Sequence, residues 1–269
     1  MVFLHTVHPP LAAFSIGPLS VHWYGIILAL AVSAGFVLSY RLFRQRGVDT
    51  AHLANLFIVI FLCGIIGGRM GHLVGEWGYY HDHLSATVQL WRGGIAIHGV
   101  LAGALLGLWG YCRWRKLAFW VTADLLVVSL PLMQAIGRWG NYFNQELYGM
   151  PTSLPWGIPV DQAFREPGYA AAQYYHPLFL YESLLMLAVF AGIWWLFRRA
   201  QLKSGQLTLA YFAMFAVVRF SLDYIRLHKP MAAGLSYTQW LSIGIFIAAA
   251  LLWWFRYRHR PAENNPPAV

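Results

Sequence analysis

Apolar residues along the chain gather into seven stretches of about 20 residues, separated by shorter polar segments. An α-helix rises 1.5 Å per residue, so about 20 apolar residues cross the hydrocarbon core of a membrane. The pattern therefore predicts an all-α, polytopic membrane protein with about seven transmembrane helices. The expected stretches are about 19–40, 52–74, 95–112, 117–139, 177–197, 206–225 and 236–255.

Lys and Arg fall mainly in alternate connections between these stretches. Twelve of the 19 basic residues follow the first, third, fifth and seventh stretches, whereas four lie in the other connections. Because basic residues accumulate in short loops on the cytoplasmic side, we expect the N terminus outside and the C terminus inside. This organisation predicts a single transmembrane domain over 1–260 with an external (periplasmic) segment at about 140–176. A Pro- and Asn-rich tail at 261–269 is expected to be disordered.

Composition excludes a water-soluble protein. Hydrophobic residues make up 59% of the chain and charged residues 11%, against roughly a quarter charged in an ordinary soluble domain. The net charge of +9 is explained by membrane topology and does not indicate nucleic-acid binding. Two cysteines, Cys63 and Cys112, are too few for a disulfide framework or a cysteine-built zinc site. The first residues lack the basic region of a cleaved signal peptide, so we expect the first stretch to be retained.

Three arginines lie outside the connections between the apolar stretches. Arg69, Arg138 and Arg219 stand within these stretches or at their ends. An arginine costs about 2.5–3.5 kcal/mol at the centre of a membrane helix on insertion scales, so a compensating environment is expected. For Arg69 and Arg138, position alone leaves a second interpretation, in which the side chains extend from helix ends to the membrane surface. Arg219 lies deeper and is expected to face protein or water.

Other polar residues gather near the same, external ends of the stretches: Tyr24, His98, Glu182 and Asp223. Each alone is typical of interfacial anchoring or a helix contact. Together with the three arginines they indicate a site for an anionic headgroup. The alternative is a transporter or channel for an anionic solute, for which the polar site is expected near the membrane midplane.

The external segment at 140–176 carries many aromatic, Pro and Gly residues but little charge. A connection of this length without a helical period is usually functional or disordered. Its Trp156, Tyr169, Tyr174 and Tyr175 are expected to lie on the membrane interface, where amphipathic rings are favourable. The segment is therefore a candidate lid or substrate-docking arm.

A polar run ends the fourth stretch. It reads Gly137-Arg138-Trp139-Gly140-Asn141-Tyr142-Phe143-Asn144-Gln145-Glu146 and is followed by Gly149. This run resembles the signature of bacterial phosphatidylglycerol:prolipoprotein diacylglyceryl transferases, G-R-x-G-N-F-x-N-x-E. Further elements similar to that family follow in the right order along the whole chain: His22-Trp23-Tyr24-Gly25, Gly68-Arg69-Met70-Gly71, His98-Gly99-Val100-Leu101-Ala102-Gly103, His176-Pro177-Leu178-Phe179-Leu180-Tyr181-Glu182 and Arg219-Phe220-Ser221-Leu222-Asp223.

The resemblance implies an enzyme of the bacterial cytoplasmic (inner) membrane. It would transfer the diacylglyceryl group of phosphatidylglycerol to the lipobox cysteine of a prolipoprotein signal peptide, forming a thioether and releasing glycerol 1-phosphate. Arg138 and Arg219 would supply positive charge to the departing phosphate, because an arginine fork binds phosphate oxygens in a bidentate way. His98 would take the proton of the cysteine thiol. In a competing interpretation, His98 orients the glycerol part of the lipid.

The resemblance also implies a set of substrate-binding residues: Tyr24, Arg69, Asn141, Asn144, Glu146, Gly149, Glu182 and Asp223. Arg69 is expected as a third phosphate ligand, Glu146 as the partner of an arginine, and Asp223 as the partner of Arg219 and Arg226. No cofactor and no metal is expected, and His81, Asp82 and His83 are interpreted as a solvated loop. The glycines at 99, 103 and 107 predict a small-residue face for close helix packing.

Three positions depart from the family pattern. Val100 replaces a glycine, Asp223 replaces a glutamate, and Phe215 replaces the tyrosine expected four residues before Arg219. Phe215 removes a hydroxyl near the expected phosphate. This departure leaves open a second alternative, a catalytically weakened relative that binds lipid or prolipoprotein.

Overall fold

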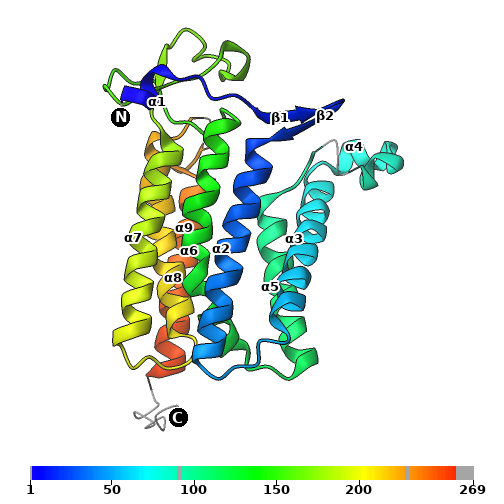
Figure 1. The fold of residues 1–269 in the computed structure, drawn as a ribbon, viewed down its shortest axis with the longest axis vertical. Coiled ribbons are helices and arrows are strands. Elements are labelled where there is room, and N and C mark those ends of the chain that lie inside the picture. The colour runs from blue at the N-terminus through cyan, green and yellow to red at the C-terminus, as the bar shows by residue number, and fades with distance from the viewer. Residues whose placement is uncertain (1, 90–92, 228–230, 259–269) are drawn as a thin grey trace. The chain divides into compact units, whose positions relative to one another are not determined.

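The computed structural model describes residues 2–89, 93–227 and 231–258 and is built mainly from α-helices (Figure 1). Seven long helices occupy the predicted stretches in the described part of the chain. Their bounds are α2 (Trp23–Gln45), α3 (Leu53–Gly75), α5 (Ile97–Arg115), α6 (Phe119–Phe143), α7 (Leu178–Arg199), α8 (Gln206–Leu222) and α9 (Tyr237–Tyr257). The predicted all-α, polytopic class is confirmed.

Six of these helices are long and apolar enough to cross a membrane, counting described residues only: α2, α3, α6, α7, α8 with the turn that follows it, and α9. The helix outside this set is α5, which has 19 residues and carries Arg113 and Arg115 in its last turn. The chain is a multi-pass membrane protein. Seven spans and the orientation of the termini stay predictions.

Short elements connect the long helices. The helical ones are α1 (Val2–Thr6), α4 (Trp77–Asp82) and the 3-10 turns η1 (Leu84–Val88), η3 (Gln162–Phe164) and η4 (Asp223–Ile225). The strands form three antiparallel hairpins: β1 (Ala12–Ile16) with β2 (Leu19–His22), β3 (Ile158–Pro159) with β4 (Tyr174–Tyr175), and β5 (Met231–Ala232) with β6 (Leu235–Ser236).

The first hairpin corrects a predicted boundary. Residues 19–22 were assigned to the first helical stretch, whereas they pair with β1 around a turn at Gly17, which has φ +59°. Glycine adopts this left-handed conformation without steric cost. A short apolar run next to a long one has no period that separates strand from helix, so the sequence pattern merged the two.

The described chain forms two compact units. The first comprises the described residues of 2–39 and 126–258, and in it α8 packs against both α7 and α9. The second comprises 40–125, and in it α3 packs against α5. The single domain expected over 1–260 stays a prediction, and the predicted disordered tail at 261–269 lies outside the described residues.

Glycines set the distance between α3 and α5. A Cβ added to Gly103 would lie 2.1 Å from the carbonyl oxygen of Cys63, and one added to Gly99 would lie 2.1 Å from that of Gly67. Both distances are far below van der Waals contact, so only glycine allows this approach. The predicted small-residue face is confirmed. Val100 completes the contact, because its Cγ2 lies 2.6 Å from where a Cβ of Gly68 would stand.

The segment at about 140–176 packs on a buried core that it shares with α7 and with the residues that follow η4. Tyr142, Tyr148, Ile158, Val160, Tyr175, Phe179 and Leu227 form one buried apolar cluster. Tyr175 is one of the four aromatic residues from which a position at the membrane interface was predicted, but it is 0% exposed and packs inside the protein. The position of the segment at the interface stays a prediction. The Tyr175 hydroxyl donates to the carbonyl of Tyr169 at 2.5 Å. The segment is thus a packed layer over the ends of α6 and α7, because its aromatic rings bury one another.

Gly103→Ala tests the glycine contact. The new methyl group must push α3 and α5 apart, and overpacking of this kind costs about 1–3 kcal/mol. We expect a lower midpoint of unfolding by sodium dodecyl sulfate for the protein purified in mild detergent. Gly110→Ala is the matched control on the same helix, since a Cβ there meets no atom within 4 Å. Equal midpoints for the two variants would contradict the packing.

Candidate active site

One buried carboxylate binds two arginines from different helices. Glu182 Oε1 lies 2.7 Å from Arg138 Nη2 and accepts a hydrogen bond from Arg219 Nη1 at 2.9 Å. The Glu182 side chain is 5% exposed, and those of Arg138 and Arg219 are 24% and 17% exposed. Charge-assisted bonds in such surroundings are short and directional. Two guanidinium groups against one carboxylate leave the cluster positive, which suits an anionic ligand.

Helix positions explain how the cluster forms. Arg138 stands in the last turns of α6, Glu182 in the first turns of α7, and Arg219 in the last turns of α8. These three helices alternate in direction along the chain, so their polar ends meet at one level of the first unit. The neighbouring Ser183 donates to the carbonyl of Ala135 at 2.8 Å and fixes the register of α7 on α6.

Arg226 joins this cluster, although sequence analysis counted it among the arginines of the connections. It follows η4 and is partly buried. Burial lowers the pKa of Arg226, and the positive charge of nearby Arg219 lowers it further, while the carboxylates of Asp223 and Glu182 act in the opposite direction. Arg226 lies seven residues, or two helical turns, after Arg219. The same spacing underlies the prediction that Asp223 binds both arginines, and that prediction already placed Arg226 close to Arg219.

Asp223 ties the end of α8 to the start of α9. Its side chain is buried and accepts a hydrogen bond from the hydroxyl of Ser236. Ser236 is also the N-cap of α9, where it forms a capping box with Gln239. Asp223 therefore sits in a fixed position near Arg226, whose backbone amide donates to the carbonyl of Asp223 at 3.3 Å. Side-chain bonds from Asp223 to Arg219 and Arg226 stay a prediction.

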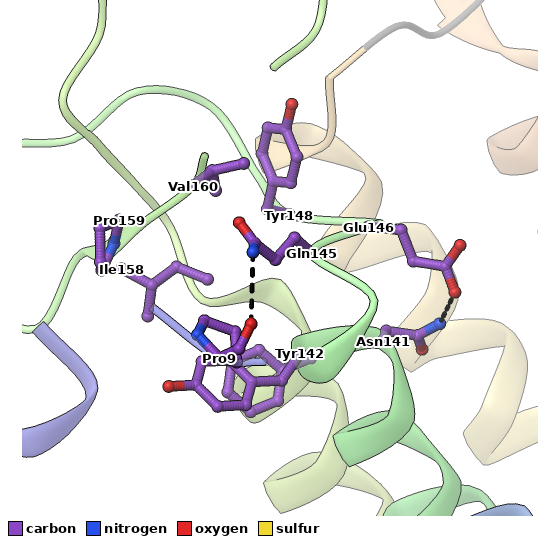
Figure 2. Close-up of a pocket in the computed structure, with 10 residues that line it drawn as sticks. Pro9, Asn141, Tyr142, Gln145, Glu146, Tyr148, Ile158, Pro159 and Val160 are labelled. Carbon is purple, nitrogen blue, oxygen red and sulfur yellow. Dashed lines mark hydrogen bonds between the residues drawn. The ribbon is translucent and has the colours of Figure 1, made fainter. Parts of the chain in front are cut away.

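The predicted partner of Glu146 is wrong. Its carboxylate accepts from the amides of Asn141 at 2.9 Å and Asn144 at 3.3 Å, and not from an arginine in the described residues. Asn141 Oδ1 in turn accepts from Arg138 Nη1 at 3.3 Å. Figure 2 shows Glu146 turned toward Asn141 beside a small cavity. Glu146 thus acts on Arg138 through Asn141, while Glu182 holds the arginine directly.

Two glycines of the signature region let chain segments approach closely. A Cβ on Gly140 would lie 2.8 Å from the ring of Tyr24, so this ring packs directly on α6 next to Asn141. A Cβ on Gly149 would lie 2.8 Å from the carbonyl oxygen of Ile225. There the backbone of Gly149 pairs with Arg226 and donates to His176 at 2.9 Å. The first unit therefore brings most of the predicted site residues together.

Arg69, in the second unit, has a different environment. Its guanidinium donates to the carbonyls of Thr87 at 2.7 Å, Ala86 at 2.5 Å, Gly93 at 2.8 Å and Gly94 at 3.0 Å. These bonds compensate the buried charge and fasten the chain before α5 to α3. The phosphate role of Arg69 stays a prediction, and its described contacts are those of a structural residue.

His98 is the second residue of α5 and is exposed. The start of this helix is held by a bond from the Ala96 amide to the carbonyl of Gly68 at 2.9 Å, next to the glycine contact. Packing between α3 and α5 therefore fixes the backbone that carries His98. Its approach to the arginines of the first unit stays a prediction. Within the described residues, no group of three or more His, Cys, Asp or Glu could hold a metal ion.

Comparison with known proteins identifies the family. Residues 11–255 match the family model described as prolipoprotein diacylglyceryl transferase. The chain belongs to this family. A phosphatidylglycerol–prolipoprotein diacylglyceryl transferase of Thermosynechococcus vestitus is 39% identical over 250 residues, covering 93% of this chain and 92% of the relative. One from Nostoc sp. is 36% identical over 275 residues, covering 100% of this chain and 97% of the relative.

Phe215 stands where the pattern of the diacylglyceryl transferase family has a tyrosine, and its neighbours show where a hydroxyl lies instead. Phe215 stacks on Tyr211, one turn earlier on α8, with ring centroids 5.9 Å apart. The hydroxyl of Tyr211 is buried and bonds Gln134 at 2.9 Å, and Gln134 stands one turn before Arg138. A hydroxyl is thus present one turn below the level that the family pattern predicts. The pair could not be predicted from the sequence, because neither Tyr211 nor Gln134 belongs to a motif of the family.

Glu182→Gln tests the shared carboxylate. The amide keeps the shape but removes the negative charge that two arginines require, and loss of one partner from a buried ion pair costs about 3 kcal/mol. We expect the free energy of unfolding in detergent to fall by about that amount, which is measured as a lower unfolding midpoint. Glu76→Gln, at an exposed position, is the control and should leave the midpoint unchanged. An unchanged midpoint for Glu182→Gln would mean that the carboxylate does not hold the arginines.

Proposed function

We propose that this protein transfers the diacylglyceryl group of phosphatidylglycerol to the lipobox cysteine of prolipoproteins in the bacterial cytoplasmic membrane. The observation that carries the proposal is the cluster of Arg138, Arg219 and Glu182. The N terminus lies outside, and the arginine cluster lies near the external membrane surface, within reach of a lipid headgroup. Twelve basic residues on the opposite side support this orientation.

The reaction forms one bond and breaks one. The sulfur of the cysteine thiolate attacks the carbon of the diacylglyceryl group that carries the phosphate ester. The bond between this carbon and the phosphate oxygen breaks. The electron pair of that bond goes to the phosphate oxygen, so charge on the leaving glycerol 1-phosphate grows in the transition state. Fixed positive groups accelerate such a step when their interaction strengthens as the charge develops.

We assign this stabilisation to Arg138 and Arg219. Glu182 keeps both guanidinium groups in place before the lipid arrives, so no reorganisation is needed during the reaction. Asn141, which accepts from Arg138, and Tyr24, whose ring packs against Gly140, are assigned to the polar headgroup. Glu146 orients the amide of Asn141, and the amide of Asn144 donates to the same Glu146 oxygen. Arg226 borders the same cluster and adds to its positive field, while the carboxylate of Asp223 offsets part of that charge.

We assign to His98 the role of the base that removes the proton of the cysteine thiol. A cysteine thiol has a pKa of about 8.5, and only its thiolate is an effective nucleophile. A neutral imidazole titrates in the range that removes this proton near neutral pH. The position of His98 at an exposed start of α5 supports access for a substrate peptide.

Transfer by the purified protein is the direct test of the function. Vesicles of phosphatidylglycerol and a synthetic lipobox peptide are incubated with the protein, and the peptide is analysed by mass spectrometry. We expect a mass gain of one diacylglyceryl unit on the cysteine. Binding of both substrates without this gain would favour the weakened relative that Phe215 suggests.

Arg138→Lys separates charge from geometry. Lysine keeps the positive charge but loses the planar fork that binds Glu182 and Asn141 together. Removal of one donor to a developing oxyanion costs about 100-fold or more in rate, and we expect a loss of kcat of this size. Arg44→Lys, on an exposed arginine, is the control. Near-normal turnover of Arg138→Lys would contradict a bidentate role.

His98→Ala tests the base. Without the imidazole of His98, the rate depends on the fraction of the substrate cysteine that is already thiolate. This fraction rises about tenfold per pH unit below the thiol pKa. We therefore expect the variant to recover part of its activity between pH 7 and 8.5, with a steeper pH dependence than the unaltered protein. A loss that high pH does not restore would support the alternative that His98 orients the lipid.

A further inference from the structure

The residue between Asn144 and Glu146 has an unusual backbone. Gln145 stands at the unspecified position of the signature and has φ +51°, and Leu147 two residues later has φ +54°. A side chain with a Cβ disfavours this left-handed region. Such a conformation persists only where the surrounding structure holds it, and it is most informative next to a functional site. Some contact must therefore keep Gln145 in place.

That contact is a reciprocal pair of hydrogen bonds with Asp161. Gln145 Nε2 donates to Asp161 Oδ2 at 2.6 Å, and the backbone amide of Asp161 donates to Gln145 Oε1 at 2.7 Å. A third, longer bond joins Gln145 Nε2 to the carbonyl of Pro9 at 3.4 Å. The Gln145 side chain is buried, so both ends of its amide are satisfied by the external segment and the N-terminal segment.

Asp161 remains charged in this arrangement. The bond from Gln145 lowers the pKa of Asp161 most, and the bond from His8 at 2.5 Å lowers it further, against the effect of burial. The carboxylate is therefore ionised at neutral pH. An ionised carboxylate is a stronger acceptor for the Gln145 amide than a neutral acid.

The two neighbours in the chain point to opposite sides. Figure 2 shows Gln145 directed toward Pro9 and the β3 residues, whereas Glu146 is directed toward Asn141. The backbone amide of Glu146 donates to the carbonyl of Asn141 at 3.0 Å, which closes the loop at the end of α6. Fixing Gln145 on one side thus fixes the carboxylate of Glu146 on the other.

We propose that Asp161 is a positioning residue for the active site. It holds Gln145 in the left-handed conformation that directs Glu146 toward Asn141, and through Asn141 it sets the guanidinium of Arg138. The inference rests on the proposed transferase function. It assigns to the external segment a part in the chemistry, namely the alignment of the phosphate-binding group.

A double-mutant cycle tests this coupling, with Asp161→Ala, Gln145→Gly and the combination of both. Asp161→Ala should lower kcat about tenfold with little change of KM for the peptide, because Gln145 relaxes and Glu146 turns away. Gln145→Gly should cost less than threefold, since glycine adopts the left-handed conformation without a clamp. In the Gln145→Gly background, Asp161→Ala should then cost less than twofold. Asp161→Asn, which keeps an acceptor oxygen, should restore most of the activity.

Asp82→Ala is the control, since Asp82 is exposed and its carboxylate bonds the neighbouring His81. Hydrogen exchange of the segment 141–149 in detergent gives a readout that does not depend on activity. Asp161→Ala should increase exchange of this segment while the core of α7 stays protected. Equal costs of Asp161→Ala in both backgrounds, or unchanged exchange, would overturn the inference. Absence of transfer by the unaltered protein would reject the proposed function. The exchange measurement would still show whether Asp161 holds Gln145 and the segment 141–149 in place.

Discussion

The pairing of Arg138 and Arg219 with the buried carboxylate of Glu182 is the interaction on which this site depends. Three helices bring these groups together, and each group alone would be costly in an apolar bundle. One carboxylate for two guanidinium groups compensates part of the charge and leaves a positive remainder. In the proposed function, a lipid phosphate supplies the missing countercharge. The same interaction therefore stabilises the ends of α6, α7 and α8 and prepares a site for an anion.

Polar residues around this cluster are arranged in successive contacts. Asn141 contacts Arg138, Glu146 contacts Asn141, and Gln145 is held by Asp161 on the far side of the loop. Glycine at 140 and 149 makes room where Tyr24 and the backbone of Ile225 approach. The signature of the diacylglyceryl transferase family is thus a local fold as much as a set of ligands. At its unspecified position, Gln145 bonds Asp161.

Sequence reasoning gave the helices well, because a run of about 20 apolar residues has few structural outcomes. The spacing of its glycines also predicted the small-residue face of α5, since residues four apart share a helix face. It did not predict that α3 is the helix that packs there. The sequence did not show whether Glu146 or Glu182 pairs with Arg138. The packing of α7 on α6 decides this, because it brings Glu182 beside the arginine. The burial of Tyr175 and the β1–β2 hairpin were missed for a related reason. Two- to five-residue strands carry too few positions for a period, and burial by aromatic neighbours cannot be seen from composition.

A structure of the protein with bound phosphatidylglycerol tests the central claim most directly. We predict the lipid phosphate within hydrogen-bond distance of both Arg138 and Arg219, with Glu182 still bound to the two guanidinium groups. A phosphate bound elsewhere, with the arginines engaged only by Glu182, would contradict the account.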